Sequence, residues 1–323
     1  MEAITVDEFG PAENMHLNQV ADPVPAEGQL AIAVEASGVH LVDTAVREGR
    51  QLGPFPLPPL PYIPGREVAG TVSGVGPGVD QAWVGKRVAV SLGNANGGYA
   101  RTAVANADDV HDIGPELSAV DAVAMVGSGR TALGILELAA ITADDVVLIT
   151  AAAGGLGTLF VQEAVRSGAT VIALAGGPQK VAIAERFGAH FAVDYTDAEW
   201  SQQVADLQRP PTVLLDGVGG TIARIATELI DAGGRVLFFG QSSGAVEGPE
   251  FDALTARGIA VRLALGPTAG FTPANIRRWA ATAIAKAAAG ELVAQVTTFP
   301  LAEAAKAHIA LAQRATVGKV VLT

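Results

Sequence analysis

Hydrophobic and polar positions follow two different patterns along the chain. Between residues 30 and 110, short β-rich runs such as 68–72 and 87–90 are separated by glycine and proline turn signals, a pattern typical of a compact β domain. After about Val120, apolar runs alternate with amphipathic stretches, which indicates a parallel sheet with helices on both faces. The pattern therefore predicts an α/β protein with a β-rich part followed by a doubly wound part.

Six apolar runs in the second part predict the strands of a Rossmann-type sheet. They cover residues 146–150, 170–175, 191–193, 212–215, 235–239 and 259–263. Gly168 and Gly188 each follow a helical run, where a left-handed residue is needed to end a helix. The end of the chain predicts helices over 276–289 and 301–311, and then a strand over 319–322.

Composition narrows the class of protein further. The chain has 323 residues, of which 50% are hydrophobic and 17% are charged, so a two-domain globular protein is expected. A net charge of -12 and a pI near 4.8 argue against a nucleic-acid partner, because binding to phosphates requires clustered Lys and Arg. The chain has no cysteine, which excludes disulfides, thiolate nucleophiles and Cys-ligated zinc.

The sequence also predicts where the protein resides. Its first residues lack the basic start and apolar run of a signal peptide. The longest stretch without a charged residue, 146–162, contains several glycines within a strand-turn-helix pattern and does not resemble a membrane span. We therefore expect a cytoplasmic protein with no membrane span.

The clearest local motif is the glycine turn that follows the first strand of the expected Rossmann sheet. Relative to G-x-G-x-x-G, Ala152 takes the first glycine position, Gly154 and Gly157 keep the second and third, and Gly155 and Leu156 lie between them. Such a turn directs the N–H groups and the positive dipole end of a helix at a pyrophosphate. An ordinary tight turn has the same glycines, but the position in the first βαβ unit favours dinucleotide binding.

The end of the second expected strand indicates which dinucleotide binds. An acid there would bind the 2′-hydroxyl of NAD and repel the 2′-phosphate of NADP, yet no Asp or Glu occurs between Glu163 and Glu185. Lys180 follows Gly176 in this segment and can pair with a phosphate. The alternative is a solvated lysine on a helix surface. The segment favours NADPH.

Twelve short motifs run through nearly the whole chain in a fixed order. They are SGVHLVD (37–43), REG (47–49), PGREVAGTV (64–72), VG (75–76), GYA (98–100), GRTA (129–132), AAAGGLG (151–157), DGVGG (216–220), GGR (233–235), FG (239–240), AH (307–308) and GKVV (318–321). In this order they resemble the quinone oxidoreductases, the zinc-independent, zeta-crystallin-like members of the medium-chain dehydrogenase/reductase superfamily.

The resemblance implies a domain organisation. It implies a GroES-like catalytic domain over 1–120, a Rossmann NADP-binding domain over 121–265 with a six-stranded parallel sheet, and a C-terminal segment over 266–323 that returns to the catalytic domain. It also implies an active site in the cleft between the domains and a homodimer formed through the last Rossmann strand, 259–263.

The resemblance also implies cofactor residues. Lys180, Tyr195 and Arg314 match the lysine, tyrosine and arginine that surround the adenosine 2′-phosphate in quinone oxidoreductases, so NADPH is the expected cofactor. The remaining residues that we assign to the cofactor lie in the family motifs at the strand ends. They are Thr131, Ala152, Gly154, Gly155, Leu156, Gly157, Gly176, Gly217, Phe239 and Gly240.

Zinc-dependent alcohol dehydrogenases of the same superfamily have a Cys where this chain has His40 and a His where it has Arg66. Arg66 cannot lose its proton to bind a metal, so we expect no metal and interpret Glu67 as a structural residue. The resemblance then implies direct hydride transfer from NADPH to a small electrophile, a quinone or an α,β-unsaturated carbonyl compound. In such a reaction the cofactor carries the chemistry, and the protein supplies alignment and donors toward the oxygen that gains charge.

Three residues are candidates for catalysis. His40 and Leu41 stand where the family usually has Asn-Pro. His40 either hydrogen-bonds the substrate oxygen or donates a proton to it, or only packs and orients a backbone loop. Asp43 and Thr131 match positions near the nicotinamide ribose or the cleft floor.

Six prolines between 54 and 64 predict an extended loop. Its aromatic residues Phe55 and Tyr62 either line the substrate pocket or pack.

Two other functions remain open. An enoyl-thioester reductase acting on acyl-CoA or carrier-bound chains would use the same hydride geometry and needs a cationic entrance, for which Arg277 and Arg278 are the candidates. A non-catalytic NADPH-binding or sensing protein is the alternative of another class, because one fold hosts many functions.

Overall fold

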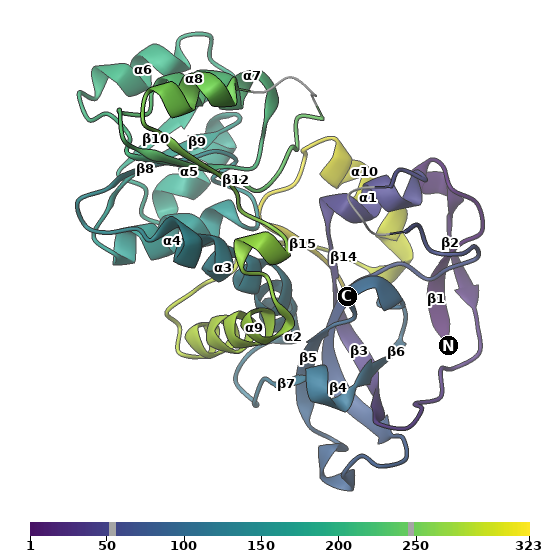
Figure 1. Ribbon diagram of the computed structural model, residues 1–323. Helices are drawn as coiled ribbons and strands as arrows, with labels where there is room; N and C mark the ends of the chain where they lie inside the picture. Colours follow the sequence, from purple (N-terminus) through teal and green to yellow (C-terminus); the bar gives the residue numbers. More distant parts are fainter. Residues whose placement is uncertain (52–55, 245–248) are drawn as a thin grey trace. The chain divides into compact units, whose positions relative to one another are not determined.

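The computed structural model describes residues 1–51, 56–244 and 249–323. The chain forms two compact units, one of Met1–Arg130 with Ala280–Thr323 and the other of Thr131–Trp279 (Figure 1). The expected boundaries at 120 and 265 differ from these. The segment before Ala280 stays with the second unit because Phe271 and Trp279 pack against Gly134, where a Cβ would lie 2.8 Å from the indole ring.

The second unit is built on a six-stranded sheet whose strands all run parallel. Its strands are β8 (Val146–Ile149), β9 (Thr170–Ala175), β10 (Phe191–Asp194), β11 (Val213–Asp216), β12 (Arg235–Phe238) and β13 (Ala260–Leu263). Their order is β10-β9-β8-β11-β12-β13, which is the Rossmann order with the first strand at the centre. The predicted Rossmann sheet is confirmed.

Helices cover both faces of this sheet. They are α3 (Arg130–Ala139), α4 (Gly157–Arg166), α5 (Pro178–Arg186), α6 (Trp200–Asp206), α7 (Gly220–Glu228) and α8 (Phe251–Ala256). Figure 1 shows α6, α7 and α8 on one face, whereas α4 and α5 contact each other on the opposite face. Gly168 and Gly188 end α4 and α5 with φ of 83° and 99°, as predicted.

The sheet of the first unit contains strands from both ends of the chain. It runs β14 (Val296–Phe299), β15 (Lys319–Leu322), β3 (Gln29–Val39), β4 (Glu67–Val75), β5 (Arg87–Ser91) and β7 (His111–Asp112), and β6 (Thr102–Asn106) also pairs with β3. A separate pair joins β1 (Glu2–Val6) to β2 (Met15–Gln19). Because β15 pairs antiparallel with β3, the C-terminal strand completes the N-terminal sheet. Helix α1 (Leu41–Arg47) follows β3, and α10 (Ala304–Ala312) precedes β15. Helix α9 (Pro273–Ala288) begins in the second unit and ends in the first.

One helical stretch bears on the expected absence of a membrane span. Helix α2 (Ala119–Ala124), a π-helical turn (Met125–Gly129) and α3 form a continuous helix. Among the described residues it is the one helix long and apolar enough to cross a membrane, with a mean hydropathy of 1.3, but 61% of its apolar window is buried inside the protein. Such burial is typical of a core helix, so the stretch is weak evidence for a span.

Candidate active site

His40 lies where β3 ends and α1 begins, and it is the N-cap residue of that helix. Its backbone N–H donates to Asp43 Oδ2 over 2.9 Å. A carboxylate three residues after an N-cap stabilises the first turn by accepting from the free N–H of the cap residue. The spacing of His40 and Asp43 in the sequence thus fixes both residues in one helical turn.

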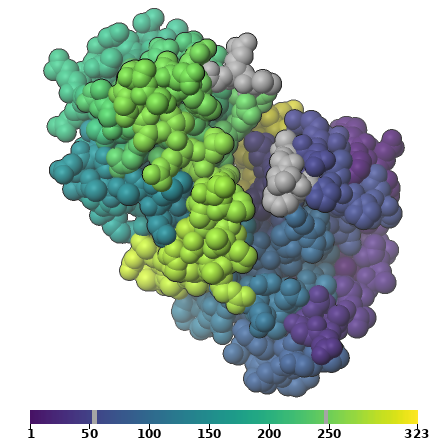
Figure 2. All heavy atoms as spheres, in the orientation of Figure 1, coloured from purple at the N-terminus to yellow at the C-terminus, as the bar shows by residue number. Residues whose placement is uncertain are grey.

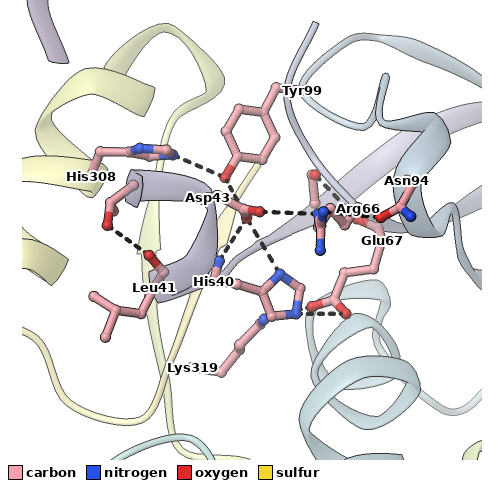
Figure 3. A network of polar contacts seen from close by, with 11 residues as sticks. His40, Leu41, Asp43, Arg66, Glu67, Asn94, Tyr99, His308 and Lys319 are labelled. Carbon is pink, nitrogen blue, oxygen red and sulfur yellow. Dashed lines mark hydrogen bonds and ion pairs between the residues drawn. The ribbon is translucent and has the colours of Figure 1, made fainter. Parts of the chain in front are cut away.

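The imidazole of His40 lies between two carboxylates (Figure 3). Nε2 is 3.1 Å from Glu67 Oε2, and Nδ1 is 3.4 Å from Asp43 Oδ2. Burial alone would lower the pKa of His40, but the charge of Glu67 and the contacts with both carboxylates outweigh it, so the pKa is raised above 6.5. The two carboxylates therefore favour the protonated form of the imidazole.

Glu67 begins β4, and its side chain is completely buried. Its Oε1 lies 2.6 Å from Nζ of Lys319, at the start of β15. Burial would raise the pKa of Glu67, but His40 and Lys319 lower it well below 4.5. Glycine makes room for the carboxylate on two sides, because a Cβ on Gly38 or Gly127 would lie within about 2 Å of a Glu67 oxygen.

Asp43 has a second set of partners in the interior of the first unit. The hydroxyl of Tyr99 lies 3.4 Å from Asp43 Oδ2 and 3.1 Å from Nε2 of His308. Both side chains are completely buried. Burial lowers the pKa of His308 to about 4, so His308 is neutral in the folded protein. These contacts fix the side chain of Asp43 in the interior of the first unit.

We use "polar network" for His40, Asp43, Arg66, Glu67, Tyr99, His308 and Lys319. The sequence analysis singled out His40 and Asp43 as candidates for catalysis, but it assigned no role to Tyr99 or His308. The sequence did offer a signal for Arg66 and Glu67, because they stand at the start of an apolar strand. A buried acid at such a position needs a buried partner. Nothing local marked Lys319 as that partner, since the pairing arises from strand order.

The donor set at this site does not fit zinc. Arg66 stands at the position where zinc-dependent relatives have a histidine, and it donates to Asn94 Oδ1 over 3.1 Å. Its Nε is 3.6 Å from Asp43 Oδ1. Glu67 is already paired with Lys319 and His40. In the described ranges no group of three or more His, Cys, Asp or Glu side chains is arranged to hold a metal ion.

The glycine turn in the second unit joins β8 to α4. Ala152 donates its N–H to Leu174 O over 3.0 Å, which ties the turn to β9. A Cβ on Gly157 would lie 2.3 Å from Ala151 O, so the first residue of α4 has no room for a side chain. Gly154 is less crowded, with one backbone oxygen 3.1 Å from a Cβ position. A tight glycine turn directly before a helix N-terminus fits a bound pyrophosphate.

Residues assigned to the cofactor come together at the carboxyl ends of neighbouring strands. After β9 and β10, a Cβ on Gly176 would lie 3.1 Å from the hydroxyl oxygen of Tyr195. After β11 and β12, a Cβ on Gly217 would lie 2.5 Å from the ring of Phe239, and Gly240 packs on the backbone of Gly217. The carboxyl edge of such a sheet is where dinucleotides bind.

Sequence reasoning missed Asp194, at the end of β10. Its Oδ1 accepts from Gly177 N over 2.8 Å, from Thr196 N over 2.9 Å and from Thr196 Oγ1 over 2.6 Å. These donors fix the β9–α5 turn, and Lys180 lies in the first turn of α5. The Asp-x-Thr spacing, typical of a side chain that closes a turn, was the signal available.

The remaining assigned residues are distributed over the two units. Thr131 and Arg314 lie in different units, as do Tyr195 and Arg314, so the convergence of Lys180, Tyr195 and Arg314 stays a prediction. Tyr62 forms two backbone hydrogen bonds with Val6, of 2.9 and 3.1 Å. Burial raises the pKa of Tyr62 to about 12.

Phe55 lies outside the described residues. The substrate role assigned to Phe55 and Tyr62 stays a prediction.

Comparison with known proteins identifies the class and the family. The family model of the alcohol dehydrogenase GroES-like domain matches residues 26–116, and that of the zinc-binding dehydrogenase matches residues 155–287. A GroES-like domain with a Rossmann domain defines an oxidoreductase of the medium-chain dehydrogenase/reductase class. The quinone oxidoreductase of Sus scrofa is 31% identical over 100% of this chain and 97% of its own length. The chain belongs to the zinc-independent quinone oxidoreductase family of this class.

Two further comparisons cover nearly the whole chain. The 2-haloacrylate reductase of a Burkholderia species is 30% identical over 99% of this chain and 98% of its own length. The crystal structure of Escherichia coli quinone oxidoreductase in complex with NADPH has a TM-score of 0.87 at 27% identity, over 100% of this chain and 99% of the other. The match to the zinc-binding dehydrogenase model covers the Rossmann half and concerns fold rather than ligands.

Proposed function

We propose that the protein is an NADPH-dependent reductase of quinones or α,β-unsaturated carbonyl compounds that works without zinc. The observation that carries the proposal is the carboxyl edge of the Rossmann sheet, where the tight glycine turn, the Gly176–Tyr195 contact and the first turn of α5 with Lys180 occur together. The Escherichia coli structure with NADPH supports this cofactor. Relatives named for reducing a quinone and a 2-haloacrylate support the class of electrophile.

In this reaction the protein mainly has to align the cofactor with the substrate, and it needs little general acid-base catalysis. NADPH bound at this site would supply the hydride and would leave as NADP⁺. In an enone, a C–H bond forms at the β carbon, the alkene π pair becomes a new π bond between the α carbon and the carbonyl carbon, and the carbonyl π pair moves onto oxygen to give an enolate. A proton from water then adds to the α carbon, and the C=O bond re-forms. The oxygen gains negative charge in this step, so nearby cations lower the barrier. Thr131 is assigned to holding the nicotinamide ribose.

The geometry of His40 favours its orienting role over proton donation. Both ring nitrogens face carboxylates, Nε2 toward Glu67 and Nδ1 toward Asp43, and Nδ1 is buried. Held in this way, the imidazole presents its two nitrogens to Asp43 and Glu67 rather than to a substrate. We assign His40 and Asp43 as positioning residues.

The enoyl-thioester reductase alternative loses part of its support. Its candidate cationic entrance is the pair Arg277 and Arg278, and both terminal nitrogens of Arg278 donate to Glu137 over 2.9 Å. Trp279 Nε1 donates to the same carboxylate. This bidentate pair occupies the guanidinium in the manner that a phosphate would. The non-catalytic NADPH-binding alternative has no observation in its favour.

We also propose that two copies associate through β13 and that the protein is cytoplasmic. Strand β13 is the edge strand of the Rossmann sheet, and Leu263 is 69% exposed and Leu265 43% exposed. An exposed apolar edge strand is a template for pairing with a second strand. Figure 2 shows the light-green chain around residues 260–270 at the surface. Sedimentation of wild type and of Leu263→Lys tests this, with a monomeric wild type as the contradicting result.

A substrate screen tests the proposed function. NADPH absorbance is followed with a panel of quinones and enones and with crotonyl-CoA, and NADH is assayed in parallel. We expect consumption with quinones or enones, and a kcat/KM for NADPH at least about 10-fold above that for NADH. Faster turnover of crotonyl-CoA than of every neutral electrophile favours the thioester reductase. NADPH binding without consumption on any substrate contradicts the proposal and favours the non-catalytic alternative.

A further inference from the structure

Arg66 of the polar network and the neighbouring Arg130 have no role in the mechanism above. Arg66 precedes β4 directly, and 21% of its side chain is exposed. Its contacts with Asn94 and Asp43 use Nη2 and Nε. A guanidinium carries five N–H donors in a planar fork, so donors of Arg66 remain for a further acceptor.

Arg130 reaches the same place from the long core helix. It follows the π-helical turn Met125–Gly129, in which Gly127 lies directly against the Glu67 carboxylate. Arg130 is three residues after Gly127, and it is close enough to Glu67 and Arg66 for both charges to act on its guanidinium. π-helical turns inside α-helices are frequent at functional sites. The helix thereby brings a second guanidinium to the Glu67 side of the network.

Arg130 is a partly exposed residue, and in the described ranges its guanidinium makes no hydrogen bond or ion pair with another side chain. Burial lowers its pKa, and Arg66 lowers it further, although Glu67 opposes both effects. A partly buried cation without a paired anion is unfavourable. The arrangement is stable when an anion from outside the chain supplies the missing charge.

The net charge of the side chains around Arg66 and Arg130 also favours an anionic ligand. Its fixed cations are Arg66, Arg130 and Lys319, and its carboxylates are Asp43 and Glu67. The excess is one positive charge when His40 is neutral and two when it is protonated, in a chain whose net charge is -12. A local cationic site in a strongly acidic protein selects an anionic ligand over a neutral one.

We propose that Arg66 and Arg130 bind the carboxylate of the substrate, so that the preferred electrophile is an unsaturated carbonyl compound that carries an acid group. This inference rests on the proposed reductase function and narrows its substrate class. The two guanidinium groups accept the carboxylate through charge-assisted hydrogen bonds.

A matched pair of substrates tests the proposal. The enone 4-oxopent-2-enoate carries a carboxylate, and its methyl ester presents the same alkene and ketone without the charge. We expect the wild-type kcat/KM for the acid to exceed that for the ester by at least about 10-fold, and Arg130→Gln to reduce kcat/KM for the acid by about 10- to 100-fold. The ester should change by less than about 3-fold, because it makes no ion pair.

Controls separate this inference from the reductase function and from misfolding. Arg101→Gln removes an exposed arginine of the same unit that pairs with Glu2 and should leave the acid-to-ester ratio unchanged. Arg130→Lys keeps the charge and should recover part of the preference. Calorimetric titration with 4-oxopentanoate, which has no alkene to reduce, should show binding to wild type and loss of binding in Arg130→Gln.

The failures of the two proposals are distinguishable. Equal kcat/KM for acid and ester in wild type, or an equal loss for both in Arg130→Gln, overturns the carboxylate site and leaves the reductase function in place. An enzyme that reduces neither the acid, nor the ester, nor any quinone overturns the proposed function.

Discussion

Glu67 Oε1 and Lys319 Nζ lie 2.6 Å apart, and the two side chains are 0% and 5% exposed. The residues belong to β4 and β15, which flank β3 on its two sides. The ion pair therefore crosses over the central strand at Gly38, where a Cβ would lie 2.0 Å from Glu67 Oε1. The ion pair thus joins β4 to the C-terminal strand β15 next to His40, which Glu67 also contacts. The pair links the folding of the sheet to the position of the imidazole.

Removing one charge of this pair should destabilise the protein strongly. Glu67→Gln leaves Lys319 buried without its counter-ion, and we expect a loss of about 3–5 kcal/mol in the free energy of unfolding. Urea unfolding followed by circular dichroism measures it. The double variant Glu67→Gln/Lys319→Met removes both charges and should lose less than Glu67→Gln alone. The exposed pair Lys306–Glu303 supplies the control, because Glu303→Gln should cost at most about 1 kcal/mol.

A methyl group at Gly38 should disturb the same pair without changing any charge. The Cβ of Gly38→Ala would meet the Glu67 carboxylate, which Lys319 and His40 hold from the other side. We expect a loss of about 1–3 kcal/mol in the free energy of unfolding. Gly74→Ala, in β4, is the matched control because no atom lies within 4 Å of its Cβ position. Equal effects of the two substitutions would contradict the crowding at Gly38.

The hydrophobic pattern was sufficient to predict the Rossmann sheet, because each strand there is a short, continuous and mainly apolar run of sequence. All six strands lie within about one residue of the predicted ranges. The domain boundaries were harder to predict, since the helix through Arg130 is continuous and no break in pattern marks the change of unit. The boundary near 279 depends on Phe271 and Trp279 packing at Gly134, a contact between distant segments.

The polar network was only partly predictable for the same reason. His40 and Asp43 are three residues apart, so their contact follows from helix geometry. Lys319 and His308 reach the network through the return of the C-terminal segment to the first sheet. Their distance along the chain leaves no local pattern, and only the antiparallel pairing of β15 with β3 places them.

The cofactor preference should depend on Lys180, in the first turn of α5. Lys180→Ala removes a cation from the expected 2′-phosphate site, and we expect kcat/KM for NADPH to fall by about 10- to 100-fold. Use of NADH should change by less than about 3-fold, because NADH carries no 2′-phosphate. Arg224→Ala, which removes an exposed cation of α7 paired with Glu228, is the control. Equal losses with both cofactors would show that Lys180 has another role.

The charge state of His40 should appear as a pH dependence of stability. Because the pKa of His40 is raised above 6.5 in the folded protein, its protonated form is stabilised by folding. This contribution is fully present below pH 6.5 and is lost as the pH rises through the folded pKa. The difference in the free energy of unfolding between wild type and His40→Asn should therefore decrease from pH 6.5 upward. Urea unfolding of both proteins between about pH 6 and 9 measures the difference.

Other titrating groups change the free energy of unfolding outside this pH range, or they contribute equally to wild type and His40→Asn. The pKa of His308 is lowered to about 4, so below pH 6.5 the unfolded chain binds this proton more tightly than the folded protein does. His308 therefore changes the free energy of unfolding below pH 6.5 and not above it. Glu67, with its lowered pKa, loses its contribution only as the pH falls through the acid range. The remaining groups are common to both proteins. A difference that stays constant or grows with pH would mean that the carboxylates do not hold a charged imidazole.

The same variant decides between the two roles of His40 in catalysis. If the imidazole only positions Asp43 and Glu67, His40→Asn should lower kcat by about 10-fold or less, and the shape of the pH profile of kcat should not change. A proton donor would give a profile that falls as the pH rises through the pKa of His40, and that fall would disappear in His40→Asn. Steady-state kinetics with a good quinone substrate at saturating NADPH separates these outcomes. We expect the first, because both nitrogens of the ring already face the buried carboxylates.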